Sequence, residues 1–287
     1  MDEVGLGQRL QEARKKAGLT QQELCQKANL SYSTLAKIER GAIRSPSIFT
    51  IQGIAMALGS SLDELIGVLP SGSSILPQTP KKRSKSGIRF VYFDINGCLV
   101  RFFHRAFTHL AEQTNVSEDI IETTFWHYND AVCRGEMSLD EFNRILAERL
   151  GVQQLNWQEY YLQAVDPIQE MRELVAWAND NYRTGLLSNI MPGFIDAMFR
   201  EDILPRLPYS AIIDSSEIHA IKPEAQAYQI AQEKAGVEPH EILLVDDSRT
   251  NLMAAEKMGW HVLWFDDYRP EESVRRIRQA LEPEAQS

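Results

Sequence analysis

IRFVYFDINGCLV, residues 88–100, begins as a short apolar run that ends at the carboxylate Asp94. Comparable apolar runs recur later in the chain, at residues 184–187, 211–213, 242–245 and 261–265. Segments with helical spacing of apolar residues separate these runs, which is typical of a parallel sheet with helices on both faces. From residue 88 onward we therefore expect a Rossmann-like α/β core.

The segment between the first two predicted strands is unusually long. It extends from residue 93 to residue 184, far more than one crossover helix of a βαβ unit requires. Its pattern is helical from about residue 103 to 165, and Ser138–Glu141 fits a capping box, in which hydroxyl and carboxylate satisfy each other's free backbone amides. We predict a helical cap inserted over residues 103–165 into an α/β domain that spans 88–287.

The first part of the chain has a different pattern. Between Gly5 and Ile66 the apolar residues recur at helical spacing in short segments. Thr20–Glu23 and Ser61–Glu64 fit the capping box, and Ser31 is a further candidate N-cap. The sequence therefore predicts a multidomain protein whose first domain, residues 1–67, is an all-α bundle of about five helices.

Charge is distributed unevenly along the 287 residues, whose formal net charge is -10. Up to Gly67 the basic and acidic residues nearly cancel, whereas residues 68–89 contain several basic residues and no acidic one. Three prolines and a low apolar content indicate that residues 68–87 form a flexible basic linker. The acidity therefore belongs to the C-terminal domain.

Composition and cysteine usage limit the class of protein. With 44% hydrophobic and 24% charged residues, the chain has the balance of a soluble globular protein. It contains no apolar run of about 18 residues and no secretory signal pattern, so we expect a cytoplasmic protein without membrane contact. Its cysteines, Cys25, Cys98 and Cys133, form no CxxC pair, so neither a disulfide framework nor a thiolate zinc site is supported.

The segment Gly18–Gly41 reads GLTQQELCQKANLSYSTLAKIERG. Its small Ala28 at the expected helix crossing and its Ile-Glu-Arg-Gly ending make residues 5–66 resemble the lambda-repressor-like (XRE-type) helix-turn-helix family. In that family the second helix of the pair enters the major groove of DNA, and dimers bind paired half-sites. The resemblance therefore implies a DNA-binding homodimer. It implies DNA contacts at Tyr32, Ser33 and Lys37, with Gln21 and Gln22 at the DNA backbone. The alternative is a module that binds a protein or only dimerises.

Four short segments of the C-terminal part contain candidate site residues. They are Phe93–Leu99, Leu187–Asn189, Ile221–Glu224 and Leu244–Ser248. Together they resemble the four-motif set of the haloacid dehalogenase (HAD) superfamily, with a cap after the first motif, over about residues 88–270. Each segment follows or ends a predicted strand, where the ligands of open α/β sheets bind.

The resemblance implies a phosphoryl-transfer site. Asp94 would attack phosphorus and form an aspartyl-phosphate, with Ser188 and Lys222 stabilising the phosphoryl oxygens. A Mg²⁺ ion would be held by Asp94, Asp246, the neighbouring Asp247 and the backbone carbonyl of Asn96. The full phosphate-binding set that the resemblance implies is Ile95, Asn96, Ser188, Asn189 and Lys222. An Asp-Asp pair after an apolar strand is also a common helix N-cap, so a structural role is the alternative.

The departure from the family lies at Asn96. Active phosphatases of the family have a second catalytic aspartate at this position, which protonates the leaving group and then deprotonates water. An amide cannot exchange a proton in this way, and loss of a general acid/base lowers rates by about 10²–10⁴. We expect a site that binds Mg²⁺ and a phosphoryl group but turns over slowly.

Three explanations for Asn96 are open. It can be the natural residue of a sensor, or an engineered substitution that traps a complex. It can also serve a reaction whose leaving group needs no proton, as in the family's dehalogenases, although Asp246 and Asp247 look like a magnesium site that those enzymes do not use. The cap adds aromatic residues near its start and middle, of which some should face the site while most form the core of the cap.

The sequence thus favours a one-component transcriptional regulator. Its first domain binds DNA, and its HAD-like domain senses a phosphorylated metabolite or provides the oligomer interface. The alternative is a working Mg²⁺-dependent HAD phosphatase that the helix-turn-helix domain locates or regulates. A third reading is an antitoxin-like or scaffolding protein whose helical bundle recruits another protein.

Overall fold

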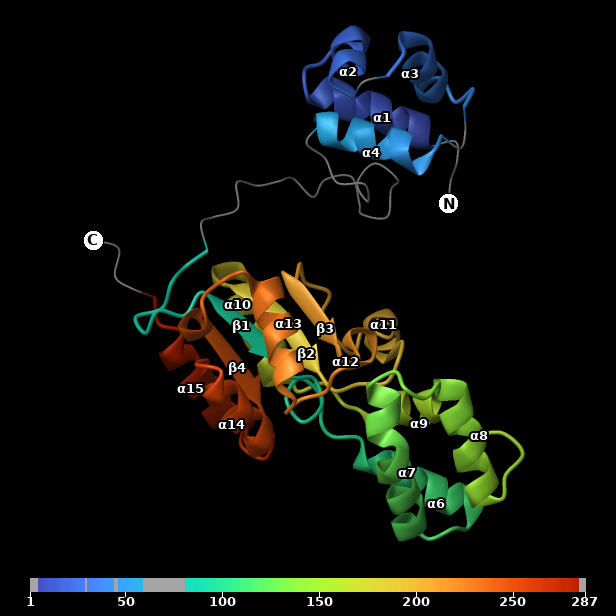
Figure 1. The fold of residues 1–287 in the computed structure, drawn as a ribbon, viewed down its shortest axis with the longest axis vertical. Helices are drawn as coiled ribbons and strands as arrows, with labels where there is room; N and C mark the ends of the chain where they lie inside the picture. Colours follow the sequence, from blue (N-terminus) through green and yellow to red (C-terminus); the bar gives the residue numbers. More distant parts are fainter. Residues whose placement is uncertain (1–4, 29, 44–45, 59–80, 284–287) are drawn as a thin grey trace. The chain divides into compact units, whose positions relative to one another are not determined.

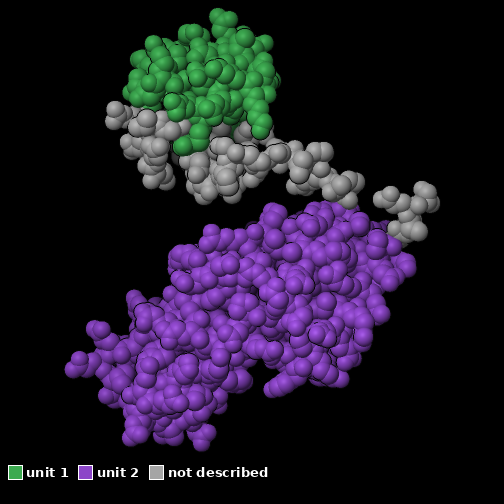
Figure 2. Space-filling model, turned by 180° about the vertical axis from the view of Figure 1, so that it is seen from behind, with its two compact units in different colours: residues 1–79 green, residues 80–287 purple. Residues whose placement is uncertain are grey.

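The structure is a computed structural model that describes residues 5–28, 30–43, 46–58 and 81–283. The chain divides into two compact units, Met1–Thr79 and Pro80–Ser287 (Figure 2). Within the described ranges, no helix has the length and apolar character that crossing a membrane requires.

The first unit is helical. Its elements are α1 (Gly5–Lys16), α2 (Gln21–Ala28), α3 (Tyr32–Glu39) and α4 (Ile48–Leu58) (Figure 1). Two predicted helix starts are confirmed: the backbone amide of Glu23 donates to the Thr20 hydroxyl at 3.2 Å, and that of Thr34 donates to the Ser31 hydroxyl at 3.2 Å. The predicted capping box at residues 61–64, and with it a fifth helix, lies outside the described residues.

The core of the first unit contains a buried ion pair beside its apolar side chains. Leu10, Leu24 and Leu35 are fully buried, and Arg14 Nε of α1 lies 2.6 Å from Glu39 Oε1 of α3. A second contact joins Arg14 Nη2 to Glu39 Oε2 at 3.1 Å. This two-point contact fixes the end of α3 against α1, and thereby the orientation of α3.

The second unit is built on a five-stranded parallel sheet, as predicted. Its strands are β1 (Phe90–Phe93), β2 (Arg183–Ser188), β3 (Ala211–Asp214), β4 (Ile242–Asp246) and β5 (His261–Trp264). They lie in the order β3-β2-β1-β4-β5, so that β1 occupies the centre (Figure 1). All four residues of β1 are buried, which explains its continuous apolar run.

Helices cover both faces of this sheet. Val91 and Phe93 belong to one apolar cluster and Phe90 and Tyr92 to another, because successive side chains of a strand point to opposite faces. Outside the cap, the helices of this unit are α10 (Gln169–Asn181), α11 (Phe194–Arg200), α12 (Ser215–Ile218), α13 (Ala225–Ala235), α14 (Arg249–Lys257) and α15 (Pro270–Ala280). A single 3₁₀ turn, Pro239–Glu241, precedes β4.

Four helices between β1 and β2 form the cap. They are α6 (His104–Thr114), α7 (Glu118–Cys133), α8 (Leu139–Leu150) and α9 (Trp157–Ala164) (Figure 1). The predicted start of α8 is present, since the Ser138 hydroxyl accepts the backbone amide of Glu141 at 3.1 Å. Phe107, Phe125 and Trp157 are buried against one another in the centre of the cap.

The structure differs from the predicted linker at its C-terminal end. Residues 81–87 belong to the second unit and pack on the rest of it. The backbone amide of Lys82 donates to Asn181 O at 2.6 Å, and that of Lys85 donates to Glu282 O at 2.9 Å. Ser84 is fully buried. Hydrogen bonds to a distant part of the chain order this polar segment, which its low apolar content does not predict. Residues 68–80 of the predicted linker lie outside the described residues.

Candidate active site

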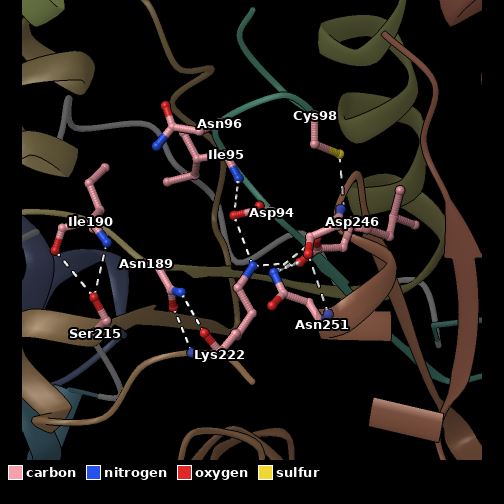
Figure 3. Close-up of polar contacts among 12 residues, drawn as sticks. Asp94, Ile95, Asn96, Cys98, Asn189, Ile190, Ser215, Lys222, Asp246 and Asn251 are labelled. Carbon is pink, nitrogen blue, oxygen red and sulfur yellow. Dashed lines mark hydrogen bonds and ion pairs between the residues drawn. The ribbon is translucent and has the colours of Figure 1, made fainter. Parts of the chain in front are cut away.

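The sheet brings the four predicted motifs together at one edge. Asp94 directly follows β1, Ser188 ends β2 and Asp246 ends β4, and these three strands are adjacent and parallel. Lys222 comes from the loop between α12 and α13. Because the carboxyl ends of parallel strands meet at the same edge, side chains far apart in the sequence form one cluster there (Figure 3).

Lys222 is the centre of this cluster. Its Nζ lies 3.0 Å from Asp94 Oδ1 and 2.6 Å from Asp246 Oδ2, and the side chain is 1% exposed (Figure 3). Burial opposes the charge of the ammonium group, but the two carboxylates outweigh burial and raise the pKa of Lys222 above its ordinary value. Lys222 is therefore a fixed cation between two acids.

Asp94 is held by one of its two carboxylate oxygens. Oδ1 accepts the backbone amide of Ile95 at 2.7 Å in addition to its contact with Lys222. Among the described residues, Oδ2 has no hydrogen-bond partner. Burial raises the pKa of Asp94 to about 6, against the opposing effect of Lys222. One oxygen of a buried carboxylate thus remains available to a ligand.

Asp246 and Asp247 complete a group of three carboxylates. Asp246 Oδ1 accepts the backbone amide of Ser248 at 2.8 Å and the Asn251 amide at 3.1 Å. One oxygen each of Asp94, Asp246 and Asp247 lies within 4.8 Å of the others. Burial, together with the charges of Asp94 and Asp246, raises the pKa of Asp247 to about 7. The site therefore carries more negative charge than Lys222 balances.

This donor set fits Mg²⁺. The ion prefers carboxylate oxygens and is usually held by few protein ligands, and three clustered carboxylates meet that requirement. Gly97 lets the loop come this close: it has a φ of 76°, and a Cβ there would lie 2.2 Å from Asp247 Oδ2. Mg²⁺ bound by these carboxylates would neutralise charge on the oxygens of a phosphoryl group.

Two predicted phosphate-binding residues from β2 differ in their environment. Ser188 Oγ is buried and has no hydrogen-bond partner among the described residues. A buried hydroxyl without a partner is unfavourable, so a ligand oxygen would satisfy it. Asn189 instead uses its side chain on the backbone of Lys222, accepting from its amide and donating to its carbonyl, both at 2.7 Å. The Asn189 side chain thus positions the lysine and is already occupied.

Comparison with known proteins agrees with this geometry. Residues 88–259 match the family described as haloacid dehalogenase-like hydrolase, and residues 10–65 match the helix-turn-helix family HTH_3. The chain belongs to the haloacid dehalogenase-like hydrolases. It joins this HAD domain to an XRE-type helix-turn-helix domain, as the sequence predicts.

The solved structures share the fold of the HAD domain. A HAD family enzyme from Bacteroides thetaiotaomicron, solved as a mutant in complex with magnesium and inorganic phosphate, is 19% identical and has a TM-score of 0.56. The match covers 63% of this chain and 95% of that one.

Two curated relatives match the chain over about the length of its helix-turn-helix domain. The immunity repressor protein of Bacillus phage phi105 is 45% identical over 62 residues, which is 22% of this chain and 42% of the repressor. The HTH-type transcriptional regulator ImmR of Bacillus subtilis is 39% identical over 64 residues, 22% of this chain and 50% of the regulator. The chain thus spans half or less of the length of these two relatives.

Asn96 of the HAD domain is held by the cap. Its Oδ1 accepts a hydrogen bond of 2.7 Å from the hydroxyl of Tyr161 on α9. Burial raises the pKa of Tyr161 above its ordinary value, so that the hydroxyl keeps its proton and remains a donor. Sequence reasoning missed Tyr161, because nothing in an aromatic-rich helix distinguishes it from residues that only pack.

A small, partly open pocket lies between the cap and the core. Asn96 and Asn189 line it from the core, and residues of α7 and α9 line it from the cap. A cap–core ion pair lies nearby: Arg134 donates to Glu224 Oε1 from Nε at 3.0 Å and from Nη2 at 2.6 Å. The other carboxylate oxygen of Glu224 accepts the backbone amide of Ile221, next to Lys222.

The predicted DNA contacts lie mostly on one helix. Tyr32, Ser33 and Lys37 are on α3 and exposed, and Gln22 of α2 is also exposed. Gln21 is half-buried, and its Nε2 donates to Glu39 Oε2 at 2.7 Å. The Gln21 side chain therefore contacts the buried ion pair of the domain, which local sequence does not reveal.

Proposed function

We propose that the chain is a DNA-binding transcriptional regulator whose HAD domain binds a phosphorylated small molecule together with Mg²⁺ and hydrolyses it slowly. One observation carries the proposal. Asn96 replaces the expected acid/base aspartate, and Tyr161 holds it in place, beside a carboxylate and lysine cluster with every other expected member. Such a site keeps its binding groups and lacks the proton-transfer group.

The proposed binding of a phosphoryl group and Mg²⁺ rests on the charges and hydrogen-bond donors of the site. Among the residues that the structure describes, Asp94 has one carboxylate oxygen without a partner and the Ser188 hydroxyl has none, while Lys222 supplies a positive charge. Three clustered carboxylates provide the ligands of Mg²⁺. Each group is already positioned, so a phosphoryl oxygen would bind without large rearrangement.

The proposal that hydrolysis is slow rests on Asn96. Its amide can donate a hydrogen bond to a leaving oxygen, but it neither gives that oxygen a proton nor takes one from water. Loss of this general acid/base lowers turnover by about 10²–10⁴. A ligand that binds quickly and leaves unreacted is suited to sensing.

The proposed role in transcriptional regulation rests on the helix-turn-helix domain. Helix α3 exposes Tyr32, Ser33 and Lys37, where a recognition helix meets the major groove. The similarity of this domain to a phage immunity repressor and to ImmR supports a role in transcription. We propose that the protein acts in the cytoplasm as a homodimer, because paired half-sites require a two-fold arrangement. The HAD domain is then a candidate for the dimer interface.

A second candidate function is an active Mg²⁺-dependent phosphatase regulated by the helix-turn-helix domain. The complete set of Asp94, Lys222, Asp246 and Asp247 favours it, since structural domains do not need three clustered carboxylates. The two functions differ in whether residue 96 limits turnover.

The test compares the protein with its Asn96→Asp variant on a panel of phosphate monoesters with Mg²⁺. We expect turnover to rise about 10²–10⁴-fold in the variant, and the double change Asp94→Asn/Asn96→Asp to abolish it. Efficient turnover by the unchanged protein would establish the phosphatase instead. Absence of turnover in both, with no binding of inorganic phosphate, would leave the HAD domain as an oligomer interface only.

DNA binding is tested separately, by selecting a bound sequence from a random duplex library and measuring its affinity with and without inorganic phosphate and Mg²⁺. We expect the affinity for DNA to change when the HAD site is filled. Unchanged affinity would show that the two domains are not coupled. A Tyr32→Ala/Lys37→Ala variant serves as the control without DNA affinity.

A further inference from the structure

The segment that leads into β1 gathers five basic side chains on the surface of the HAD domain. All five are exposed, and we call them the basic patch: Lys81, Lys82, Arg83, Lys85 and Arg89. Residues 81–89 contain no acidic residue, whereas residues 90–287 contain 17 Lys or Arg against 33 Asp or Glu. The basic patch is therefore a concentration of positive charge on a domain that is otherwise strongly acidic.

Hydrogen bonds to the rest of the domain fix the backbone of this segment. Ser84 and Pro283 form an isolated β-bridge, and the Ser84 hydroxyl accepts the backbone amide of Ile88 at 3.0 Å. The Ser86 hydroxyl donates to Ala280 O at 3.3 Å, at the end of α15 (Figure 1). Groups on an ordered backbone lose less conformational entropy on binding than groups on a flexible tail. The basic patch is thus a positioned surface.

The basic patch and the candidate active site lie at opposite edges of the sheet. Residues 81–89 lead into β1 at the amino ends of the strands, whereas Asp94 and Asp246 lie at the carboxyl ends. Arg183, the half-buried first residue of β2, adds a further basic side chain at the amino-end edge. A partner bound at the basic patch would therefore leave the candidate active site accessible.

Two carboxylates contact the basic patch without neutralising it. Glu241 Oε1 lies 3.7 Å from Arg83 Nη2 and 3.5 Å from Arg89 Nη1, so one acid serves two guanidinium groups. Lys85 Nζ lies 2.7 Å from Glu282 Oε2, but both side chains are more than half exposed, and exposed ion pairs are weak. An anion can therefore bind the patch without first breaking a strong ion pair.

The chemistry of the patch favours the phosphate backbone of DNA as its partner. Several neighbouring cations suit a polyanion, and duplex DNA carries one negative charge per about 1.7 Å of its axis. A membrane is less suitable, because basic segments that bind lipid also present residues such as Trp, Phe or Leu to it. Among the described residues, the exposed large hydrophobic side chains include none from residues 81–89.

The connection to the helix-turn-helix domain limits how far the patch can lie from DNA bound by that domain. Residues 59–80 separate α4 from the patch, and these 22 residues span at most about 80 Å when fully extended. A duplex of that length has about 23 base pairs, at roughly 3.4 Å each. A second contact within this reach benefits from a high effective concentration.

We propose that the basic patch of the HAD domain binds the phosphate backbone of the DNA that flanks the site of the helix-turn-helix domain. This inference rests on the proposed function, because it assumes that the helix-turn-helix domain binds DNA. Phosphate contacts position a protein without reading sequence, so the flanking DNA has no required sequence. Each contact releases counterions, and the affinity therefore falls steeply as salt increases.

The first experiment compares two duplexes that carry the sequence selected by the full chain. One duplex ends at the selected sequence, and the other adds about 20 base pairs on each side, within the reach of the patch. Fluorescence anisotropy measures the affinity of the full chain for both at several salt concentrations. We expect the longer duplex to bind roughly tenfold or more tightly, with a slope of log affinity against log salt that is steeper by about 2–3. Equal affinity and equal slope would overturn the inference.

The second experiment removes charge from the patch. Lys81→Gln/Lys82→Gln/Lys85→Gln leaves unchanged the backbone amides of Lys82 and Lys85 that order the segment. This variant should bind the longer duplex no more tightly than the shorter one. Lys81→Arg/Lys82→Arg/Lys85→Arg should keep the tight binding, because a phosphate contact requires the charge. The two duplexes on the unchanged protein provide the result even where a variant does not fold.

A matched control removes three charges from exposed positions on α8 and α11 of the same domain: Arg144→Gln/Arg149→Gln/Arg200→Gln. It should bind both duplexes as the unchanged protein does. An equal loss of affinity in this control would assign the effect to net charge and overturn the inference.

The remaining outcomes separate this inference from the proposed function. If the glutamine variant of the patch keeps the tight binding of the longer duplex, the helix-turn-helix domain still binds DNA and the inference is overturned. If that variant loses only binding to vesicles of anionic phospholipid, the partner is a membrane and the inference is overturned as well. If the unchanged protein selects no duplex, the proposed DNA binding and the inference are overturned together.

Discussion

The hydroxyl of Tyr161 donates a hydrogen bond of 2.7 Å to the side-chain oxygen of Asn96, and so joins cap helix α9 to the loop after β1. The contact lies at the position where a phosphatase of this family transfers protons. Residue 96 therefore has a fixed orientation only when the cap is in place. Through this contact the cap takes part in the candidate site.

We predict that Tyr161 sets the acidity of a carboxylate at position 96. In the Asn96→Asp variant, the Tyr161 hydroxyl would stabilise the ionised carboxylate and lower its pKa, because a hydrogen bond to the charged form favours that form. Adding Tyr161→Phe should move a limb of the pH profile of kcat/KM upward by roughly one pH unit. Tyr160→Phe, on the same helix with its hydroxyl bonded to Gln113, is the control. An unchanged profile would assign Tyr161 to packing alone.

We predict that the metal-free HAD domain loses stability as the pH rises. The pKa of Asp247 is raised to about 7, so the folded state binds this proton more tightly than the unfolded chain, whose aspartates titrate near pH 4. The stabilisation is complete below about pH 4 and is lost as the pH rises through about 7. The thermal unfolding midpoint without metal should thus fall between pH 5 and pH 8.

Removal of the Asp247 charge should reverse this effect. At pH 8 without metal, Asp247→Asn should raise Tm of the HAD domain by roughly 2–4 °C, the shift typical of about 1 kcal/mol in a domain of this size. It should also reduce the rise in Tm that Mg²⁺ gives the unchanged protein. Asp180→Asn, an exposed change on α10, is the control by scanning calorimetry. If Asp247→Asn instead lowers Tm at pH 8, repulsion among the three carboxylates does not destabilise the metal-free domain.

We predict that the Arg134–Glu224 pair holds the closed cap over the site. Both side chains are partly exposed, so Arg134→Gln should cost only about 0.2–1 kcal/mol in stability. Glu224→Gln should weaken binding of inorganic phosphate more than Arg134→Gln does, because Glu224 also accepts the backbone amide of Ile221 beside Lys222. Dissociation constants for both single variants and the double variant measure the coupling. If the two single changes weaken phosphate binding equally, the contact of Glu224 with the Ile221 amide does not help to position Lys222.

We predict that Lys37 contributes charge to DNA binding without reading sequence. Its exposed side chain on α3 suits a phosphate contact, so Lys37→Ala should weaken binding to all duplexes about equally. The slope of log affinity against log salt should fall by about 1. Lys234→Ala, on α13 of the HAD domain, is the control. If Lys37→Ala weakens binding to the selected duplex but not to other duplexes, Lys37 recognises bases.

The sequence by itself determined the architecture. Each strand is a short apolar run followed by a polar segment. A continuous apolar run is typical of the inner strands of a parallel sheet, such as β1 and β4, which are buried on both faces. The members of the site around Asp94, Lys222 and Asp246 were also predictable, since side chains at the ends of adjacent parallel strands meet at one edge. Helix starts such as Ser31 followed from local hydrogen bonding.

Only the tertiary structure decided which side chains remain free to bind. Asn189 turns to the backbone of Lys222, Gln21 turns to Glu39, and Tyr161 reaches Asn96 across 65 positions of the chain. Residues 81–87 join the HAD domain because carbonyls from distant segments accept their amides. Such contacts depend on where packing brings distant segments together, whereas periodicity reports only local structure. The pocket beside Asn96 is lined by residues that this packing brings together.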